Sequence, residues 1–254
     1  MGRLIFSFFK LYTMHLRNGS PKIYWLAFVL FIWPVSGFGQ GGNALTAKEK
    51  KQGWHSLFDG KDLKGWHTYL MHSVVPAWKV SKGVILLQHA PGMGSGDLVT
   101  NQEYQNFDLE LDWKISRGGN SGIIFDVHES KKYPATYETG PEMQVLDNLH
   151  ADDNKKDSHL AGSLYDLIPA DPRVVHPAEV WNHVRIRLNH GHLRLWMNGK
   201  KVVETQMWNS QWKKLVAGSK FLTMKGFGTF KKGHIALQDH GDTVSFRRIK
   251  IKEL

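Results

Sequence analysis

Three polar side chains interrupt an otherwise apolar segment at residues 141–148, which read PEMQVLDN. Glu142 and Gln144 are two residues apart, so in a β-strand they point to the same face. Asp147 joins them only if a β-bulge shifts the register by one residue. A carboxylate beside an amide and a second carboxylate can transfer protons and hold a polar ligand. The alternative is a polar stripe on a solvated outer face.

A second group that could do chemistry lies in the segment QDHG, residues 238–241. Asp239 and His240 follow a predicted strand, and the loops at strand ends carry function in many sandwich proteins. A histidine titrates near neutral pH, so His240 can act as an acid or a base. The alternative is a turn histidine with Asp239 capping the loop.

Three further polar side chains are candidates for ligand binding. Asn120 follows two glycines and is either a turn residue or a contact for hydroxyl groups. Tyr165 and His159 lie in or near the segment AGSLYDL and are predicted to line a cleft, although each alone is more often structural. Glu110 and Asp112 alternate with leucines and are predicted to lie on the solvated face of a strand.

The sequence predicts no particular cofactor. It contains no cysteine and no His-Glu-x-x-His, Walker or Rossmann glycine pattern. A Ca²⁺ or other divalent ion held by carboxylates has no signature of fixed spacing here and stays open.

The elements that must position these side chains are strands. Residues 107–115 alternate apolar and polar with period two, and Asn198-Gly199 is a strong signal for a two-residue hairpin turn. One helix is predicted at about residues 210–217. Short strands separated by turn residues indicate an all-β antiparallel sandwich or barrel. Strands are predicted within residues 77–88, 107–115, 121–127, 181–203, 233–239 and 244–254.

The first 39 residues are predicted to be a secretory signal peptide. Four basic residues and no acid accompany an apolar run at residues 23–33, followed by small residues before Gln40. The run is too short to span a bilayer, so no stable membrane span is expected after cleavage, and the alternative is an uncleaved anchor. We therefore expect an exported protein, periplasmic or extracellular, with a linker or short capping helix at residues 40–53 and one domain at 54–254.

Composition narrows the classes of partner. The formal net charge is +10, but the basic residues are scattered without a long run, so nucleic acid is not an expected partner. The absence of cysteine excludes a disulfide framework, so stability must come from a core. The ten tryptophans suit a protein that stacks sugars, but sandwich cores also use tryptophan. Four of them are predicted to be in the core: Trp54, Trp66, Trp78 and Trp113.

Several segments together resemble the 3-keto-disaccharide hydrolase domain family. They occur in family order over about residues 54–254 and read HSLFDGKDLKGW, GGNSGIIF, PEMQVLDN, AGSLYDL, WNHVRIRLNHGHLRLWMNGKKV and GHIALQDHGDTVSFRRIKIKEL. The resemblance implies a concanavalin A-like jelly roll of two antiparallel sheets, related to family 16 glycoside hydrolases. One departure concerns Asp126, which stands where the family often has arginine, so no role is carried over to that position.

The resemblance also implies a substrate class and site roles. The strand at Glu142 resembles the E-x-D-x-x-E strand of family 16 enzymes, with Gln144 and Asp147 in the later positions. A sugar oxidised to a ketone at C3 has an acidified C2 hydrogen, so a base can remove it, the C1 substituent can leave, and water can add to the enone. The expected catalytic residues are Glu142 or His240 for proton transfer, with Asp147 as partner or metal ligand.

The same resemblance implies which side chains bind the sugar, and two other functions remain open. The expected substrate-binding residues are Gln144, Asn120, Tyr165, His159 and Asp239. A non-catalytic carbohydrate-binding module uses the same jelly roll, because a fold does not imply a function. A purely structural envelope domain is the third class.

Overall fold

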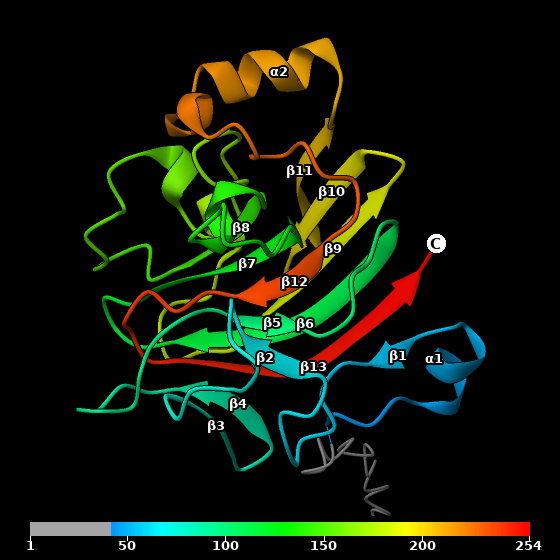
Figure 1. The fold of residues 1–254 in the computed structure, drawn as a ribbon, viewed down its shortest axis with the longest axis vertical. Helices are drawn as coiled ribbons and strands as arrows, with labels where there is room; N and C mark the ends of the chain where they lie inside the picture. Colours follow the sequence, from blue (N-terminus) through cyan, green and yellow to red (C-terminus); the bar gives the residue numbers. More distant parts are fainter. Residues whose placement is uncertain (1–41) are drawn as a thin grey trace, which may run out of the picture. The chain divides into compact units, whose positions relative to one another are not determined.

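The computed structural model describes residues 42–254, which form two antiparallel β-sheets stacked face to face (Figure 1). The larger sheet has eight strands in the order β11-β10-β9-β6-β13-β4-β3, with β1 also paired to β13. The smaller has five strands in the order β2-β5-β12-β7-β8. The predicted all-β jelly-roll sandwich is confirmed.

The strands are short, and their bounds follow the alternation in the sequence. The larger sheet comprises β1 (His55–Ser56), β3 (Trp78–Ser81), β4 (Val84–Leu87), β6 (Phe107–Ile115), β9 (Asn182–Asn189), β10 (His192–Met197), β11 (Lys200–Gln206) and β13 (Val244–Glu253). The smaller sheet comprises β2 (Trp66–Thr68), β5 (Leu98–Thr100), β7 (Asn120–Val127), β8 (Glu142–Leu146) and β12 (His234–Leu237). The helices are α1 (Ala47–Lys51), η1 (Thr136–Glu138), η2 (Asp157–His159), η3 (Pro172–Val174), α2 (Ser210–Ala217) and η4 (Lys220–Thr223).

Turn chemistry sets the β9-β10-β11 ladder as the sequence predicts. His190-Gly191 and Asn198-Gly199 each place two successive residues at positive φ, which a type I′ hairpin turn requires. Glycine adopts this region without steric cost, and asparagine tolerates it better than most residues. The helix predicted at residues 210–217 is also confirmed, with the side chain of Asn209 accepting from the backbone N–H of Trp212 at its start.

The core lies between the two sheets and is filled by alternate strand residues. On β6, Leu109, Leu111 and Trp113 are buried and face the smaller sheet. Trp66 and Trp78 are buried with them, so three of the four tryptophan predictions are confirmed. The prediction for Trp54 is wrong.

Trp54 lies outside the core because it sits beside α1 and not within a strand. Its ring is half-buried, with the Lys250 ammonium 5.0 Å from the ring centroid. The α1 helix is a short capping helix closed by a capping box between Thr46 and Glu49. Glu49 also bonds the Lys250 Nζ at 2.6 Å, which ties α1 to β13.

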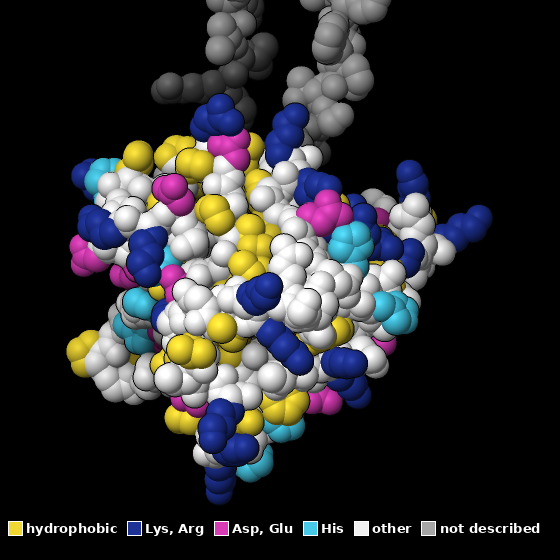
Figure 2. Space-filling view, turned by 90° about the horizontal axis from the view of Figure 1, so that it is seen from above, with side chains coloured by type: hydrophobic (Ala, Val, Ile, Leu, Met, Phe, Trp, Pro, Cys, Tyr) yellow, Lys and Arg dark blue, Asp and Glu magenta, His cyan; other side chains and the backbone are white. Residues whose placement is uncertain are grey.

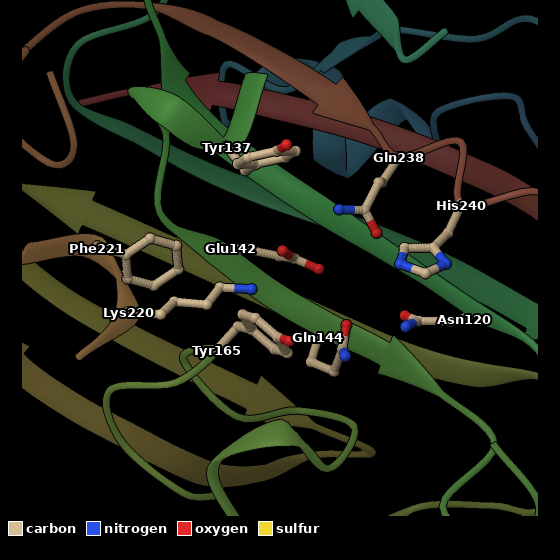
Figure 3. A pocket seen from close by; sticks show the side chains of 9 residues that line it. All are labelled: Asn120, Tyr137, Glu142, Gln144, Tyr165, Lys220, Phe221, Gln238 and His240. Carbon is tan, nitrogen blue, oxygen red and sulfur yellow. The ribbon is translucent and has the colours of Figure 1, made fainter. Parts of the chain in front are cut away.

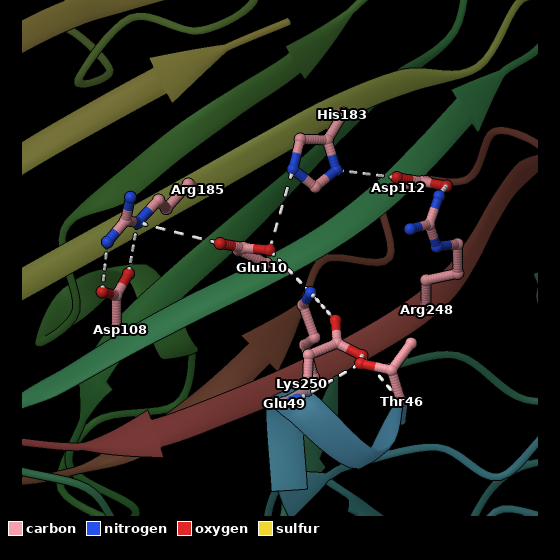
Figure 4. Close-up of polar contacts among 9 residues, drawn as sticks. All are labelled: Thr46, Glu49, Asp108, Glu110, Asp112, His183, Arg185, Arg248 and Lys250. Atoms are coloured by element: carbon pink, nitrogen blue, oxygen red, sulfur yellow. Dashed lines mark hydrogen bonds and ion pairs between the residues drawn. The ribbon is translucent and has the colours of Figure 1, made fainter. Parts of the chain in front are cut away.

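The outer face of the larger sheet is covered by ion pairs (Figure 4). Asp112 accepts hydrogen bonds from His183 at 2.8 Å and from Arg247 at 3.1 Å, and Glu110 pairs with Lys250 at 2.8 Å. Burial alone would raise the pKa of Asp112, but the hydrogen bond from His183 and the nearby Arg248 and Arg247 hold it below its ordinary value. Glu110 and Asp112 therefore lie on the outer face, as predicted. Asp112, however, is buried by its partners and is not freely solvated.

On the face seen in Figure 2, basic side chains are scattered and do not form one patch. Figure 2, which views the end that carries α2, shows Lys and Arg side chains spaced between apolar and neutral ones. None of the helices in residues 42–254 is both long and apolar enough to cross a membrane. The predicted signal peptide lies outside the described residues and stays a prediction.

Asp126 is a buried carboxyl without a partner. It has a φ of 54° at a bulge where the pairing of β7 with β12 shifts register, and neither carboxyl oxygen has a hydrogen bond within the described structure. Complete burial raises its pKa well above the ordinary value. The neutral form is therefore favoured in the folded protein compared with the unfolded chain, where the carboxyl group ionises near pH 4.

We expect Asp126 to make the protein less stable as pH rises. Its folded pKa is raised, so its contribution is fully favourable below about pH 4 and is lost as pH rises towards the folded pKa, by up to about 1.4 kcal/mol per pH unit. Asp126→Asn should flatten the decline in urea midpoint between pH 5 and 8. An equal slope in both proteins would contradict this. The pKa of Glu142 is also raised, but Glu142 is present in both proteins, so its effect on the difference between their pH slopes cancels.

Candidate functional site

One cavity of about 210 Å³ opens on the outer face of the smaller sheet, the face turned away from the larger sheet (Figure 3). Its walls come from β7, β8, the loop after β12, and three further segments outside the strands. The lining residues are Asn120, Tyr137, Glu142, Gln144, Tyr165, Lys220, Phe221, Gln238 and His240.

Strand alternation explains the polar residues of PEMQVLDN. Met143 and Val145 belong to the core between the sheets, so Glu142 and Gln144 point to the opposite face, into the cavity. The prediction that these two share a face is confirmed. The cavity is the feature that accommodates polar side chains in this otherwise apolar strand.

Asp147 does not join them, which corrects its predicted role. The pairing of β7 with β8 has no register shift, so the bulge that Asp147 needed is absent from this pair. Its carboxylate accepts from the backbone N–H of Gly118 at 2.9 Å and of Leu149 at 3.1 Å, and it contacts His150 at 2.9 Å. Asp147 holds the turn after β8 and is not among the cavity residues.

Glycine at position 122 makes room for Glu142. A Cβ built on Gly122 would lie 2.1 Å from Glu142 Oε1, closer than two such atoms can approach. The carboxyl group therefore occupies the space above β7 that any other residue would fill.

Glu142 is the one carboxyl group among the described residues that line the cavity. Its side chain is 5% exposed. Burial raises its pKa to about 8, and the nearby positive charge of Lys220 limits the rise. A carboxyl group that titrates near neutral pH is suited to proton transfer, because its two forms are both populated.

Tyr165 forms a second wall, and His159 supports it from behind. The Tyr165 hydroxyl donates to Asp153 Oδ2 at 2.7 Å, and the rings of His159 and Tyr165 lie 4.4 Å apart. His159 also bridges Asp153 at 2.7 Å and Asp166 at 2.8 Å. Tyr165 lines the cavity as predicted. The prediction for His159 is corrected, because its ring nitrogens are bound to these carboxylates and it positions the wall.

Lys220 and Phe221 form the third wall at the start of η4. The Lys220 Nζ lies 4.1 Å from the centroid of the Tyr165 ring and points towards Glu142 (Figure 3). Its backbone N–H donates to Asp166 at 2.8 Å, and Phe221 stacks on Phe227 at 3.8 Å. These contacts fix the backbone that carries the lysine.

The opposite end of the cavity is formed by Gln238, His240 and Asn120. The backbone N–H of Gln238 donates to the Gly122 carbonyl at 2.9 Å, which brings the residue after β12 next to β7. Asn120 donates its backbone N–H to Asp242 at 2.9 Å, leaving its side chain free to face the cavity. His240 and Asn120 therefore line the cavity, and their predicted roles in proton transfer and sugar binding stay predictions.

Asp239 does not line the cavity, which corrects its predicted role. Its carboxylate contacts His89 Nε2 at 2.7 Å and accepts from the backbone N–H of Gly96 at 2.9 Å. Asp239 also accepts from the Gly241 N–H at 3.0 Å. This corresponds to the alternative left open by the sequence, in which Asp239 caps the loop that carries His240.

Sequence reasoning missed four cavity residues: Lys220, Phe221, Tyr137 and Gln238. Gln238 could have been found, since alternation along the predicted strand at 233–239 places it on the same face as Ala236. Nothing in the sequence separates Lys220 from the other lysines. Its place depends on the fold of the segment after α2.

Metal ligands are not clustered in the described part of the chain, where no three His, Cys, Asp or Glu side chains gather as around an ion. The divalent ion left open by the sequence stays a prediction, which a chelator can test.

The geometry brings together the groups that a proton abstraction needs. Glu142 can accept a proton, the Lys220 ammonium can stabilise a developing oxyanion, and His240 can donate to a departing oxygen. Tyr165, Gln144 and Phe221 provide a polar and aromatic enclosure of the kind that holds a sugar ring.

Comparison with known proteins gives consistent matches over most of the chain. A family model described as a 3-keto-alpha-glucoside-1,2-lyase-like domain matches residues 53–252. A protein of Bacteroides thetaiotaomicron named 3-keto-disaccharide hydrolase is 35% identical over 228 residues, which cover 80% of this chain and 79% of that protein.

Two solved structures from Parabacteroides distasonis, each described as a proposed glycosyl hydrolase, have a similar fold. The first is 34% identical, with a TM-score of 0.77, over 84% of this chain and 99% of that one. The second is 30% identical, with a TM-score of 0.63, over 79% of this chain and 99% of that one.

Proposed function

The chain belongs to the 3-keto-alpha-glucoside-1,2-lyase-like family, and from this we propose that it cleaves glycosides already oxidised to a ketone at C3. The relative from Bacteroides thetaiotaomicron is named for activity on a 3-keto-disaccharide. The proposed reaction removes the C2 proton and expels the substituent on C1.

The observation that carries the proposal is a single buried carboxyl group facing a lysine. Direct hydrolysis of an unoxidised glycoside uses two carboxyl groups, about 5 Å apart for retention and about 6.5 to 9.5 Å apart for inversion. In the described structure the cavity offers Glu142 alone. Elimination from a 3-keto sugar needs one base and a group that stabilises an enolate, and Glu142 with Lys220 supports that requirement.

The steps use residues of this chain. The Glu142 carboxylate takes the proton from C2, and the electrons of that bond form an enolate whose oxygen lies near the Lys220 ammonium. The enolate collapses, the C1–O bond breaks, and His240 donates a proton to the leaving oxygen. Water then adds at C1 and a proton returns to C2, giving the free 3-keto sugar. Release before water addition would make the enzyme a lyase.

The deciding experiment compares a 3-keto-glucoside with its unoxidised parent. We expect release of the leaving group only from the keto substrate, and exchange of the C2 hydrogen in deuterated water. Equal cleavage of both would contradict the elimination route. Binding of either without turnover would favour the carbohydrate-binding alternative. Parallel assays after dialysis against a chelator test the predicted divalent ion.

The close fit of Gly122 against Glu142 gives a further prediction. Gly122→Ala should lower kcat by about 10²-fold, because the new Cβ forces the carboxyl group away and a shift near 1 Å costs roughly that much. The melting temperature should also fall, because overpacking a buried site costs about 1 to 3 kcal/mol, so kcat is compared at a temperature where both proteins are folded. The matched control is Gly42→Ala, where the nearest atom would lie at an ordinary 3.8 Å. An unchanged kcat in Gly122→Ala would show that Glu142 need not occupy this position.

A further inference from the structure

Two amide oxygens in the cavity have no hydrogen-bond partner. Asn120 Oδ1 and Gln238 Oε1 are buried, and neither accepts a hydrogen bond from the described part of the chain. Each residue is 8% exposed. A buried acceptor left unpaired costs about 1 to 3 kcal/mol, so these oxygens are sites for donors that a ligand brings.

The orientation of the Gln238 amide is fixed by its neighbour. The amide nitrogen of Gln238 faces the Glu142 carboxyl group (Figure 3). In this orientation the nitrogen donates towards the carboxyl oxygens, which is favourable. The Gln238 oxygen is therefore directed to the other side, towards His240 and the free space of the cavity.

Strand pairing orders the cavity residues along one axis. On β7, Ile124 pairs with Glu142, Gly122 with Gln144, and Asn120 with Leu146. Asn120 therefore lies four residues along the strand from the level of Glu142, about 13 Å at the usual rise. Gln238 bonds Gly122 and so lies between them.

The Lys220 ammonium lies at the other end of this axis. Tyr165 donates its backbone N–H to the Glu142 carbonyl at 3.0 Å, and Lys220 lies over the Tyr165 ring. Figure 3 shows Lys220 and Phe221 on one side of Glu142, with Asn120 and His240 on the other. Along the cavity, the Lys220 ammonium is therefore followed by the Glu142 carboxyl group and then by the amide oxygens of Gln238 and Asn120.

A 3-keto-glycoside has the same order along its ring. C3 carries the ketone, C2 carries the acidic hydrogen, and C1 carries the leaving group. With the ketone at Lys220 and C2 at Glu142, C1 and its substituent extend towards Gln238, His240 and Asn120. This orientation also brings the leaving oxygen to His240.

We infer that Asn120 and Gln238 form the subsite for the leaving group, and that they select one that carries hydroxyl groups, such as a second sugar or a polyol. Two acceptors without partners gain hydrogen bonds from hydroxyl donors, whereas an apolar leaving group keeps them buried and unpaired. This inference rests on the proposed function and adds the direction in which the substrate lies.

The test compares two leaving groups of similar chemistry. A 3-keto-disaccharide joined through a secondary hydroxyl and cyclohexyl 3-keto-glucoside both release a secondary alcohol, but only the first alcohol carries further hydroxyl groups. We expect wild type to prefer the disaccharide in kcat/KM. In Asn120→Leu that preference, the ratio of kcat/KM for the two substrates, should fall by about 3- to 10-fold, as expected for one lost hydrogen bond.

Controls separate the subsite from the reaction. Asn120 bonds Asp242 through its backbone N–H, so Asn120→Leu should fold. Gln238→Met serves as a second variant measured by the same preference ratio. Equal loss on both substrates, or an unchanged preference, would overturn the subsite while leaving the proposed function intact. Failure of wild type to cleave either substrate would overturn both.

Discussion

Glu142→Gln is expected to lower kcat/KM on a 3-keto-glucoside by about 10²- to 10⁴-fold, the usual contribution of a positioned general base. Glutamine keeps the size of the side chain but cannot accept the C2 proton. The substitution places a neutral amide, not a charge, in the buried site, so the fold should be retained. Measuring the melting temperature of the variant checks this. The matched control is Glu204→Gln on exposed β11, which should keep full activity.

The pH profile of wild type should identify the role of Glu142. As a base it must be ionised, and its pKa is raised to about 8, so kcat/KM should show a rising limb with its midpoint near pH 8. The rising limb should be absent from the residual activity of Glu142→Gln. A falling limb near pH 8 that disappears in Glu142→Gln would instead make Glu142 the acid, and full activity in the variant would remove it from the chemistry.

Lys220→Met is expected to lower kcat by about 10²- to 10³-fold, similar to the loss of one donor from an oxyanion site. The methionine keeps the length of the chain without the charge that stabilises the enolate. The same charge limits the pKa of Glu142, so the rising limb of the pH profile should move to higher pH in the variant.

That shift distinguishes an electrostatic role for Lys220 from a structural one. Loss of packing would lower activity without moving the limb. Lys220→Arg should recover part of the activity, because it restores a cation of different shape. Lys213→Met on the exposed side of α2 is the control for removing a positive charge nearby. An unmoved limb together with full activity would show that another group faces the ketone.

Local sequence determined the strands and the polar strand face. The alternation in residues 107–115 and the Asn198-Gly199 turn depend on neighbours a few residues away, so the pattern alone predicts them. The same reasoning placed Glu142 and Gln144 together, because side chains two apart share a face in any strand. It found His240 and Asn120 by residue type at strand ends.

Tertiary structure alone decided which polar groups meet at the cavity. Lys220 faces Glu142 across 78 positions of sequence because the segment after α2 packs over the smaller sheet, and no local pattern encodes that contact. Asp147 and Asp239 have the residue types of a site, yet backbone N–H groups bind their oxygens in turns. The two-residue period of a strand determines which of its side chains share a face. Which side chain lies opposite them across a cavity depends on the packing of segments distant in sequence.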